Sequence, residues 1–139
     1  MTGASAIDVV RKLYAAYDNH DHVAIQQLYR DDATHDEISQ SKTKRGSVEI
    51  AAGMEKLFTW LPDIRWQVRT TIVGADGTIA VAYVMHATAP RRDGATPSKS
   101  ISLRGVQLVE VEDGQIRHSE DYWDAATFQR QLSLKPEED

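Results

Sequence analysis

The spacing of apolar side chains changes along the chain, from a helical period in the first half to alternation in the second. Apolar residues recur every three or four positions over 7–17, 24–29 and 50–61, a spacing that predicts three helices. Ser5, Asp21 and Ser47 stand where the N-caps of these helices are expected. Pro62 is expected to end the third helix because proline cannot continue it.

From residue 64 onwards, apolar and polar positions alternate, which is typical of strands with one buried face. Strands are predicted over 64–72, 78–89, 101–111 and 115–123, with glycine-containing turns at 74–77 and 112–114. The polar run 39–46 is predicted to be a loop, and 90–100, with two prolines and a glycine, an exposed and mobile one. A short helix from Asp124 to about Leu132 precedes a charged tail that is expected to fray.

Helices followed by a run of antiparallel strands indicate an α+β fold. We expect a cone, in which a curved antiparallel sheet wraps around the three N-terminal helices and opens into a pocket, with the short C-terminal helix beside it. The length of 139 residues predicts a single domain over 1–139.

The amino-acid composition excludes some classes of partner and some kinds of chemistry. The chain has 16 basic and 21 acidic residues, a net charge of -5, which argues against nucleic acid as a partner. It has no cysteine, so disulfides, thiolate metal sites and a cysteine nucleophile are excluded. Neither a signal peptide nor a membrane-spanning run is recognisable, so a soluble, cytoplasmic protein is expected. The "HDH" at 20–22 is explained by its place between two helices, and no metal site is predicted.

The last predicted strand ends in "HSEDYWD", an unusual place for carboxylates. Alternation puts Ser119, Asp121 and Trp123 on one face of the strand and Tyr122 on the other. If Asp121 faces a poorly solvated pocket, its pKa should be raised and it can serve as an acid or base near neutral pH. If it faces water, it merely ends the strand. Asp124 is interpreted as the N-cap of the last helix.

A second acidic cluster is "THDE" at 34–37. As a short strand it would direct His35 and Glu37 to one face, whereas as a turn it would be solvated. His86 falls inside the second predicted strand, on the face opposite Tyr83 and Met85, and is either a structural group or a hydrogen-bond partner for substrate. The aromatic residues expected to shape the cavity are Tyr14, Tyr17, Phe58, Trp66 and Trp123.

Three stretches together resemble the nuclear transport factor 2-like superfamily, in particular its SnoaL-like polyketide cyclase branch. They are "VVRKLYAAYDNHDHVAIQQLYRDDATHDE", "RGSVEIAAGMEKLF" and "VEDGQIRHSEDYWDAATFQRQL". The resemblance covers nearly the whole chain. It implies a curved antiparallel sheet around helices, a deep pocket for a hydrophobic small molecule, no metal or organic cofactor, and a homodimer.

The resemblance also implies roles for individual residues. Alignment with the ketosteroid isomerases places Glu37 at the position of their carboxylate base, while Leu13 and Val106 stand where these enzymes have oxyanion donors, which argues against steroid isomerisation. In the SnoaL-like cyclases the acid/base aspartate of the last strand matches Asp121, and Gln107 is a candidate polar partner. "EDYWD" also matches a motif of the limonene-epoxide hydrolases, whose catalytic aspartate again corresponds to Asp121.

Three functions therefore stay open. The first is a cofactor-independent acid/base enzyme, a cyclase or isomerase, with Asp121 as principal group and Glu37 or His35 as the second. The second is an epoxide hydrolase in which Asp121 activates water, with His35, His86, Tyr83 or Arg104 as electrophilic helper. The third is a binding module without turnover, in which the acidic residues would be solvated and the pKa of Asp121 ordinary.

Overall fold

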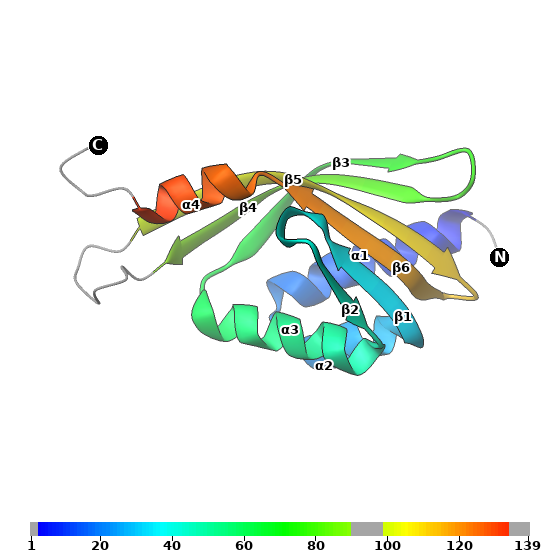
Figure 1. Cartoon of the computed structure of the whole chain (residues 1–139). Helices are drawn as coiled ribbons and strands as arrows, with labels where there is room; N and C mark the ends of the chain where they lie inside the picture. The colour runs from blue at the N-terminus through cyan, green and yellow to red at the C-terminus, as the bar shows by residue number, and fades with distance from the viewer. Residues whose placement is uncertain (1–2, 90–98, 134–139) are drawn as a thin grey trace.

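The computed structural model describes residues 3–89 and 99–133, which form four α-helices and a curved six-stranded sheet (Figure 1). The predicted α+β class is confirmed. None of the helices in these ranges is both long enough and apolar enough to cross a membrane. Most of the loop predicted at 90–100, and the charged tail, lie outside the described residues.

The three N-terminal helices are present: α1 (Gly3–Asp18), α2 (His22–Leu28) and α3 (Ser47–Trp60). Asp21 caps α2 as predicted, because its Oδ1 accepts a hydrogen bond from the backbone amide of Ala24 at 3.0 Å. The other two predicted caps are wrong. Helix α1 begins before Ser5, and Ser47 is the first helical residue of α3, with Gly46 at the cap position.

The four predicted strands are confirmed as β3 (Arg65–Val73), β4 (Ile79–Ala89), β5 (Lys99–Glu112) and β6 (Gln115–Trp123). The last helix, α4, spans Ala125–Ser133. Asp124 is its cap, since its carboxylate accepts hydrogen bonds from the amide of Ala126 at 3.0 Å and the hydroxyl of Thr127 at 2.7 Å. Alternating hydrophobicity and turn residues were therefore sufficient to define the C-terminal half.

Two further strands correct the expected topology. Strand β1 (Tyr29–Glu37) follows α2 directly, and β2 (Lys42–Arg45) occupies the run predicted to be a loop, after the short 3₁₀ helix η1 (Ile38–Gln40). The strand order is β2-β1-β6-β5-β4-β3. Because β1 pairs with β6 in parallel, the sheet is mixed, whereas an antiparallel one was expected. Both strands are rich in polar residues, so hydrophobicity alone does not reveal them.

The core lies between the concave face of the sheet and the helices. Helix α1 buries Leu13, Tyr14 and Tyr17 against this face, and α4 packs along β5 (Figure 1). The large hydrophobic side chains shielded most completely from water are Leu13, Ile25, Tyr29, Leu61, Ile64, Ile79, Val81, Val109 and Ile116. The edge strand β3 is less buried than its alternation predicted, and Val68 and Ile72 are exposed.

Candidate active site

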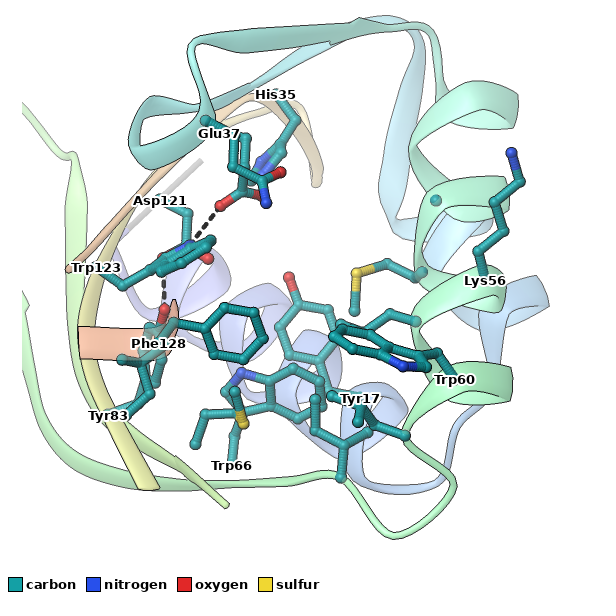
Figure 2. Close-up of a pocket in the computed structure, with 18 of the residues that line it drawn as sticks. Tyr17, His35, Glu37, Lys56, Trp60, Trp66, Tyr83, Asp121, Trp123 and Phe128 are labelled. Atoms are coloured by element: carbon teal, nitrogen blue, oxygen red, sulfur yellow. Dashed lines mark hydrogen bonds and ion pairs between the residues drawn. The ribbon is translucent and has the colours of Figure 1, made fainter. Parts of the chain in front are cut away.

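A cavity of about 400 Å³ lies between the concave face of the sheet and α3 (Figure 2). This volume is in the range of sites that bind small organic molecules. Phe128 of α4 reaches in between Trp60 and Trp123, at ring-centroid distances of 6.0 and 5.5 Å, in edge-to-face contacts. The apolar and aromatic lining residues are Met54, Leu57, Trp60, Leu61, Ile64, Trp66, Met85, Leu103, Trp123 and Phe128.

The polar residues of the cavity come from strands β1 and β6. Parallel pairing sets Glu37 beside Asp121 and His35 beside Ser119, and these residues face inward while Asp36, His118 and Glu120 face outward. Of the two alternatives for "THDE", the strand is therefore present. The sequence assigned His35, Glu37 and Asp121 to one site, and the structure brings them together at the cavity wall.

Asp121 occupies a half-buried position between a phenol and a second carboxylate. Its Oδ1 accepts a hydrogen bond of 2.7 Å from the hydroxyl of Tyr83. Burial, and then the negative charge of Glu37, raise the pKa of Asp121 from 3.8 to about 7, against the opposing effects of Tyr83 and His35. Near neutral pH this side chain is therefore ionised in part of the molecules and protonated in the rest.

Tyr83 reaches Asp121 because the strand between them has no side chain in the way. Gly105 of β5 pairs with Tyr83 on one side and with Trp123 on the other. A Cβ added at Gly105 would lie 2.3 Å from the hydroxyl oxygen of Tyr83 and 2.4 Å from its Cζ. The glycine inside this strand thus permits a close approach that no other residue would allow.

His35 and Glu37 form a second network beside Asp121. The His35 ring has Nδ1 2.7 Å from Ser119 Oγ and Nε2 3.2 Å from Glu37 Oε2. The indole Nε1 of Trp123 donates to Glu37 Oε1 at 2.6 Å. With Nε2 of His35 as donor to Glu37, Nδ1 accepts from the Ser119 hydroxyl, so both ring nitrogens are satisfied. Glu37 is thereby held by two donors at the edge of the cavity.

Tyr14 and Tyr17 line the cavity, as predicted, and Gln107 sets their orientation from behind. The buried amide of Gln107 accepts from Tyr14 Oη at 2.7 Å and donates to Tyr17 Oη at 3.2 Å. Burial raises the pKa of both tyrosines well above 10, so both stay neutral; Tyr14 gives its hydroxyl proton to Gln107, whereas Tyr17 accepts from Gln107. Gln107 itself does not line the cavity, which corrects its assignment as a direct contact for substrate.

Two other assignments need correction. His86 lies on the outer face of β4, where its Nε2 is 3.2 Å from Gln67 Oε1, because Tyr83 and Met85 take the inward positions of that strand. Phe58 is buried behind the cavity wall, stacked on the His20 ring at 4.4 Å. Neither lines the cavity, whereas Trp66 and Trp123 do, as predicted.

Several cavity residues were not assigned to the site from the sequence. Tyr83 was considered only as a helper in epoxide opening. Lys44 fell in a predicted loop, and Phe128 in the terminal helix. The glycine inside β5 was the signal that could have identified Tyr83, because a glycine in a strand often marks a close approach.

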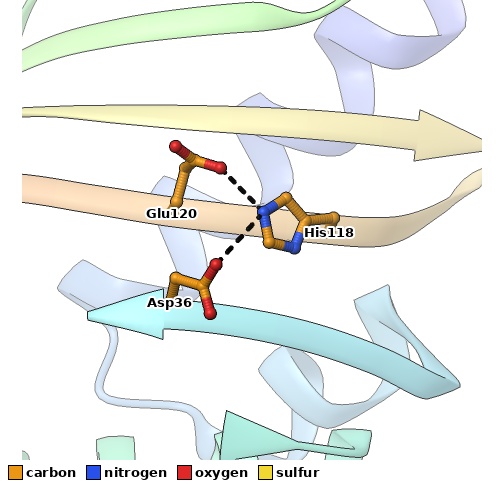
Figure 3. A group of neighbouring side chains, drawn as sticks. All are labelled: Asp36, His118 and Glu120. Carbon is orange, nitrogen blue, oxygen red and sulfur yellow. Dashed lines mark hydrogen bonds and ion pairs between the residues drawn. The ribbon is translucent and has the colours of Figure 1, made fainter. Parts of the chain in front are cut away.

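Potential metal ligands meet on the opposite face of the sheet. In the described part of the chain, one group of three such residues has its ligand atoms within 4.8 Å of one another, namely Asp36, His118 and Glu120 (Figure 3). Nε2 of His118 is 2.8 Å from Glu120 and 3.8 Å from Asp36, while Nδ1 is 2.7 Å from the hydroxyl of Thr34. These contacts account for the cluster as a charged hydrogen-bond network, and its outward direction separates it from the cavity. His20 and His22 do not share a site, since His20 contacts Ile64 O and His22 contacts Glu55.

Comparison with known proteins gives the class of protein to which this fold and cavity correspond. The family model of the SnoaL-like domain matches residues 10–119. The chain therefore belongs to the SnoaL-like family, within the superfamily that the sequence resembled. A search among functionally curated proteins gives no match.

Solved structures agree with the fold. A protein from Jannaschia sp. CCS1 assigned as a SnoaL-like polyketide cyclase is 16% identical, with a TM-score of 0.81 over 96% of this chain and 94% of the other. IdmH from Streptomyces antibioticus, assigned as a polyketide cyclase, is 19% identical, with a TM-score of 0.78 over 91% and 97%. TerC, co-crystallised with polyporic acid, is 20% identical, with a TM-score of 0.77 over 94% and 99%. At these identities the likeness establishes the fold, not the reaction.

Proposed function

We propose that this protein is a cofactor-independent acid/base enzyme that catalyses a cyclisation or isomerisation of a hydrophobic small molecule. The observation that carries the proposal is the position of Asp121, on the wall of a largely apolar cavity, with its pKa raised to about 7. A carboxyl group near half-ionisation at neutral pH is effective both in removing and in returning a proton.

The proposed reaction is a proton transfer at a carbon next to a carbonyl group. The Asp121 carboxylate takes the proton, the electron pair of the C–H bond moves toward the carbonyl oxygen, and the protonated Asp121 returns a proton to another atom of the substrate. Tyr83 holds Asp121 in place with its 2.7 Å hydrogen bond. Tyr17 is neutral, lines the cavity and accepts a hydrogen bond from Gln107, so its own hydroxyl is suited to donate to an oxygen of the substrate.

A compact aromatic carbon acid tests the base directly, without knowledge of the natural substrate. The ring of 5-nitrobenzisoxazole opens when a base removes its one acidic C–H proton. The nitrogen–oxygen bond then breaks, and the product is a coloured cyanophenolate. We expect Asp121→Asn to lower the rate by about 100-fold or more, the usual contribution of a positioned base.

Asp36→Asn is the matched control, since it removes a carboxylate from the outer face of the same sheet and should leave the rate unchanged. An Asp121→Asn protein that opens the ring as fast as wild type would show that Asp121 is not the base.

The two other functions have less support in the cavity. An epoxide hydrolase needs an acid to protonate the epoxide oxygen. Of the four candidates only Tyr83 and His35 line the cavity, and both already contact the carboxylates. A binding module without turnover was expected to leave the pKa of Asp121 ordinary, and the raised value argues against it. Screening simple epoxides for diol products separates the first of these from the cyclase proposal.

We also propose that the protein forms a homodimer through the outer face of the sheet. Ladder partners Ile72, Ala80 and Leu108 share this face with Ala82, Val106 and Tyr122. Ile72, Val106 and Tyr122 are exposed to water, at 58%, 39% and 42%. A group of apolar residues on an open sheet face is typical of a protein interface.

A further inference from the structure

Two lysines line the cavity on the side of α3, although most of the lining is apolar. They are Lys44 of β2 and Lys56 of α3. Figure 2 places Lys56 on α3, across the cavity from Asp121. Neither residue is needed for the proton transfer proposed above.

Lys44 is directed to this place by strand pairing and by a glycine. Its ladder partner on β1 is His35, so both side chains lie on the inner face of the sheet. The side chain then crosses to α3, where a Cβ added at Gly53 would lie 2.0 Å from the Lys44 ammonium nitrogen and 2.9 Å from its Cε. Lys44 is half-buried there. Lys56 follows Gly53 by three residues, so Lys56 and the ammonium group of Lys44 lie along the same face of α3.

The charges of the cavity are separated between its two walls. Glu37 and Asp121 stand on the wall formed by β1 and β6, and the lysines on the wall formed by α3. Among the described residues no carboxylate lies within ion-pair distance of either lysine ammonium. An anionic group in this cavity is therefore repelled from one wall and attracted to the other.

We propose that the molecule bound in this cavity carries an anionic group, a carboxylate or phenolate, and that Lys44 binds this group. The positive charge of Lys56 adds to the electrostatic attraction. The inference rests on the proposed function, because it specifies the substrate of the same site. The anion at α3 fixes the direction of the molecule, the apolar middle of the cavity holds its hydrophobic body, and the end that reacts is presented to Asp121. Lys44 thus acts as a specificity-determining residue.

Two fluorescent probes with one skeleton test this assignment. They are 1-anilinonaphthalene-8-sulfonate, an anion, and N-phenyl-1-naphthylamine, the same skeleton without the sulfonate. The sulfonate keeps its charge at all relevant pH values, so titration of Asp121 does not change the probe. We expect Lys44→Met to weaken binding of the anionic probe about tenfold and to leave the neutral probe within about twofold. The affinity of wild type for the anionic probe should fall as salt is added.

Two further variants complete the test. Gly53→Ala keeps the charge of Lys44 but displaces its ammonium group, so it should also weaken binding of the anionic probe and not of the neutral one. Lys12→Met removes an exposed lysine of α1 and should leave the affinity for both probes unchanged. If Lys44→Met weakens both probes equally, or neither, the assignment is wrong. The measurement involves no turnover, so its result is independent of the proposed reaction. The lysine assignment can be refuted while Asp121 proves to be the base, and it can hold even if Asp121 proves not to be the base.

Discussion

Asp121 should cost the protein stability at neutral pH, and replacing it with asparagine should recover that stability. In the unfolded chain the carboxyl group loses its proton near its ordinary pKa of 3.8, whereas in the folded protein it keeps the proton until about pH 7. Between these values the folded state binds more protons than the unfolded state. The contribution of Asp121 to the unfolding free energy is therefore complete below pH 3.8 and is lost as the pH rises through 7.

The size of the effect follows from the two pKa values. Each pH unit between them is worth about 1.4 kcal/mol, so a pKa of about 7 in place of 3.8 corresponds to at most about 4 kcal/mol. Asp121 borders a cavity and can relax toward it, so we expect about 2–4 kcal/mol. Asparagine has nearly the same shape and its side-chain oxygen can still accept the hydrogen bond from Tyr83, so the substitution removes the charge and little else.

The assay is urea unfolding of wild type and Asp121→Asn, followed by the fluorescence of the three tryptophans, at one protein concentration and at several pH values from about 4.5 to 8. The variant should gain about 2–4 kcal/mol on wild type across this range. Asp124→Asn is a control that should lower the unfolding free energy instead of raising it, because the pKa of Asp124 is lowered by its hydrogen bonds with Thr127. Parallel curves for wild type and Asp121→Asn would refute a raised pKa at Asp121.

Three further outcomes can be measured. Glu37→Gln removes the charge that helps to raise the pKa of Asp121, so the pH at which the opening of 5-nitrobenzisoxazole is half-maximal should move from about 7 to a lower value in a pH–rate profile. Gly105→Ala puts a methyl group where the Tyr83 ring lies, so the same rate should fall about tenfold or more while circular dichroism shows the fold retained; an unchanged rate would mean that Tyr83 does not position Asp121. Val106→Glu places a charge at the proposed dimer interface, and light scattering should show a shift from dimer to monomer, whereas an equally dimeric variant would place the interface elsewhere.

The sequence predicted elements best where one face of the element is buried. Helix α2 and strands β5 and β6 were recognised because their apolar residues follow a regular period, and β4 because it is an apolar run that follows a glycine-containing turn. Strand β1 was left as one of two alternatives because its polar residues pair with β6, more than 70 residues away, and β2 was missed because it is a short polar edge strand that pairs with β1. The parallel pairing of β1 with β6 has no local signal at all.

In the site, too, features set by neighbouring residues in the sequence were predicted, and features set by contacts between distant segments were not. The phase of β6 predicted that Asp121 and Trp123 share a face, and both line the cavity. His86 was assigned to the cavity and Tyr83 only to an alternative reaction, because β4 is apolar on both faces and its phase does not reveal which face is inward. The contact of Tyr83 with Asp121 depends on the pairing of β4, β5 and β6 and on Gly105 in the middle strand. No single stretch of sequence predicts this arrangement.

The pairing of β1 with β6 decides which acidic residues become chemically useful. Each strand carries acidic residues on both faces, so a slip of one residue in β6 would exchange Asp121 for Glu120 at the cavity wall. On the outer face, hydrogen bonds with Tyr122 and His118 lower the pKa of Glu120, whereas on the inner face burial and the charge of Glu37 raise the pKa of Asp121. The register is fixed by contacts that favour only one alignment, among them the 2.8 Å hydrogen bond between Tyr29 and Ser119 and the contacts of Ser39 with the backbone of Trp123. These contacts stabilise the alignment in which two carboxylates meet at an apolar cavity, and that alignment gives Asp121 its raised pKa.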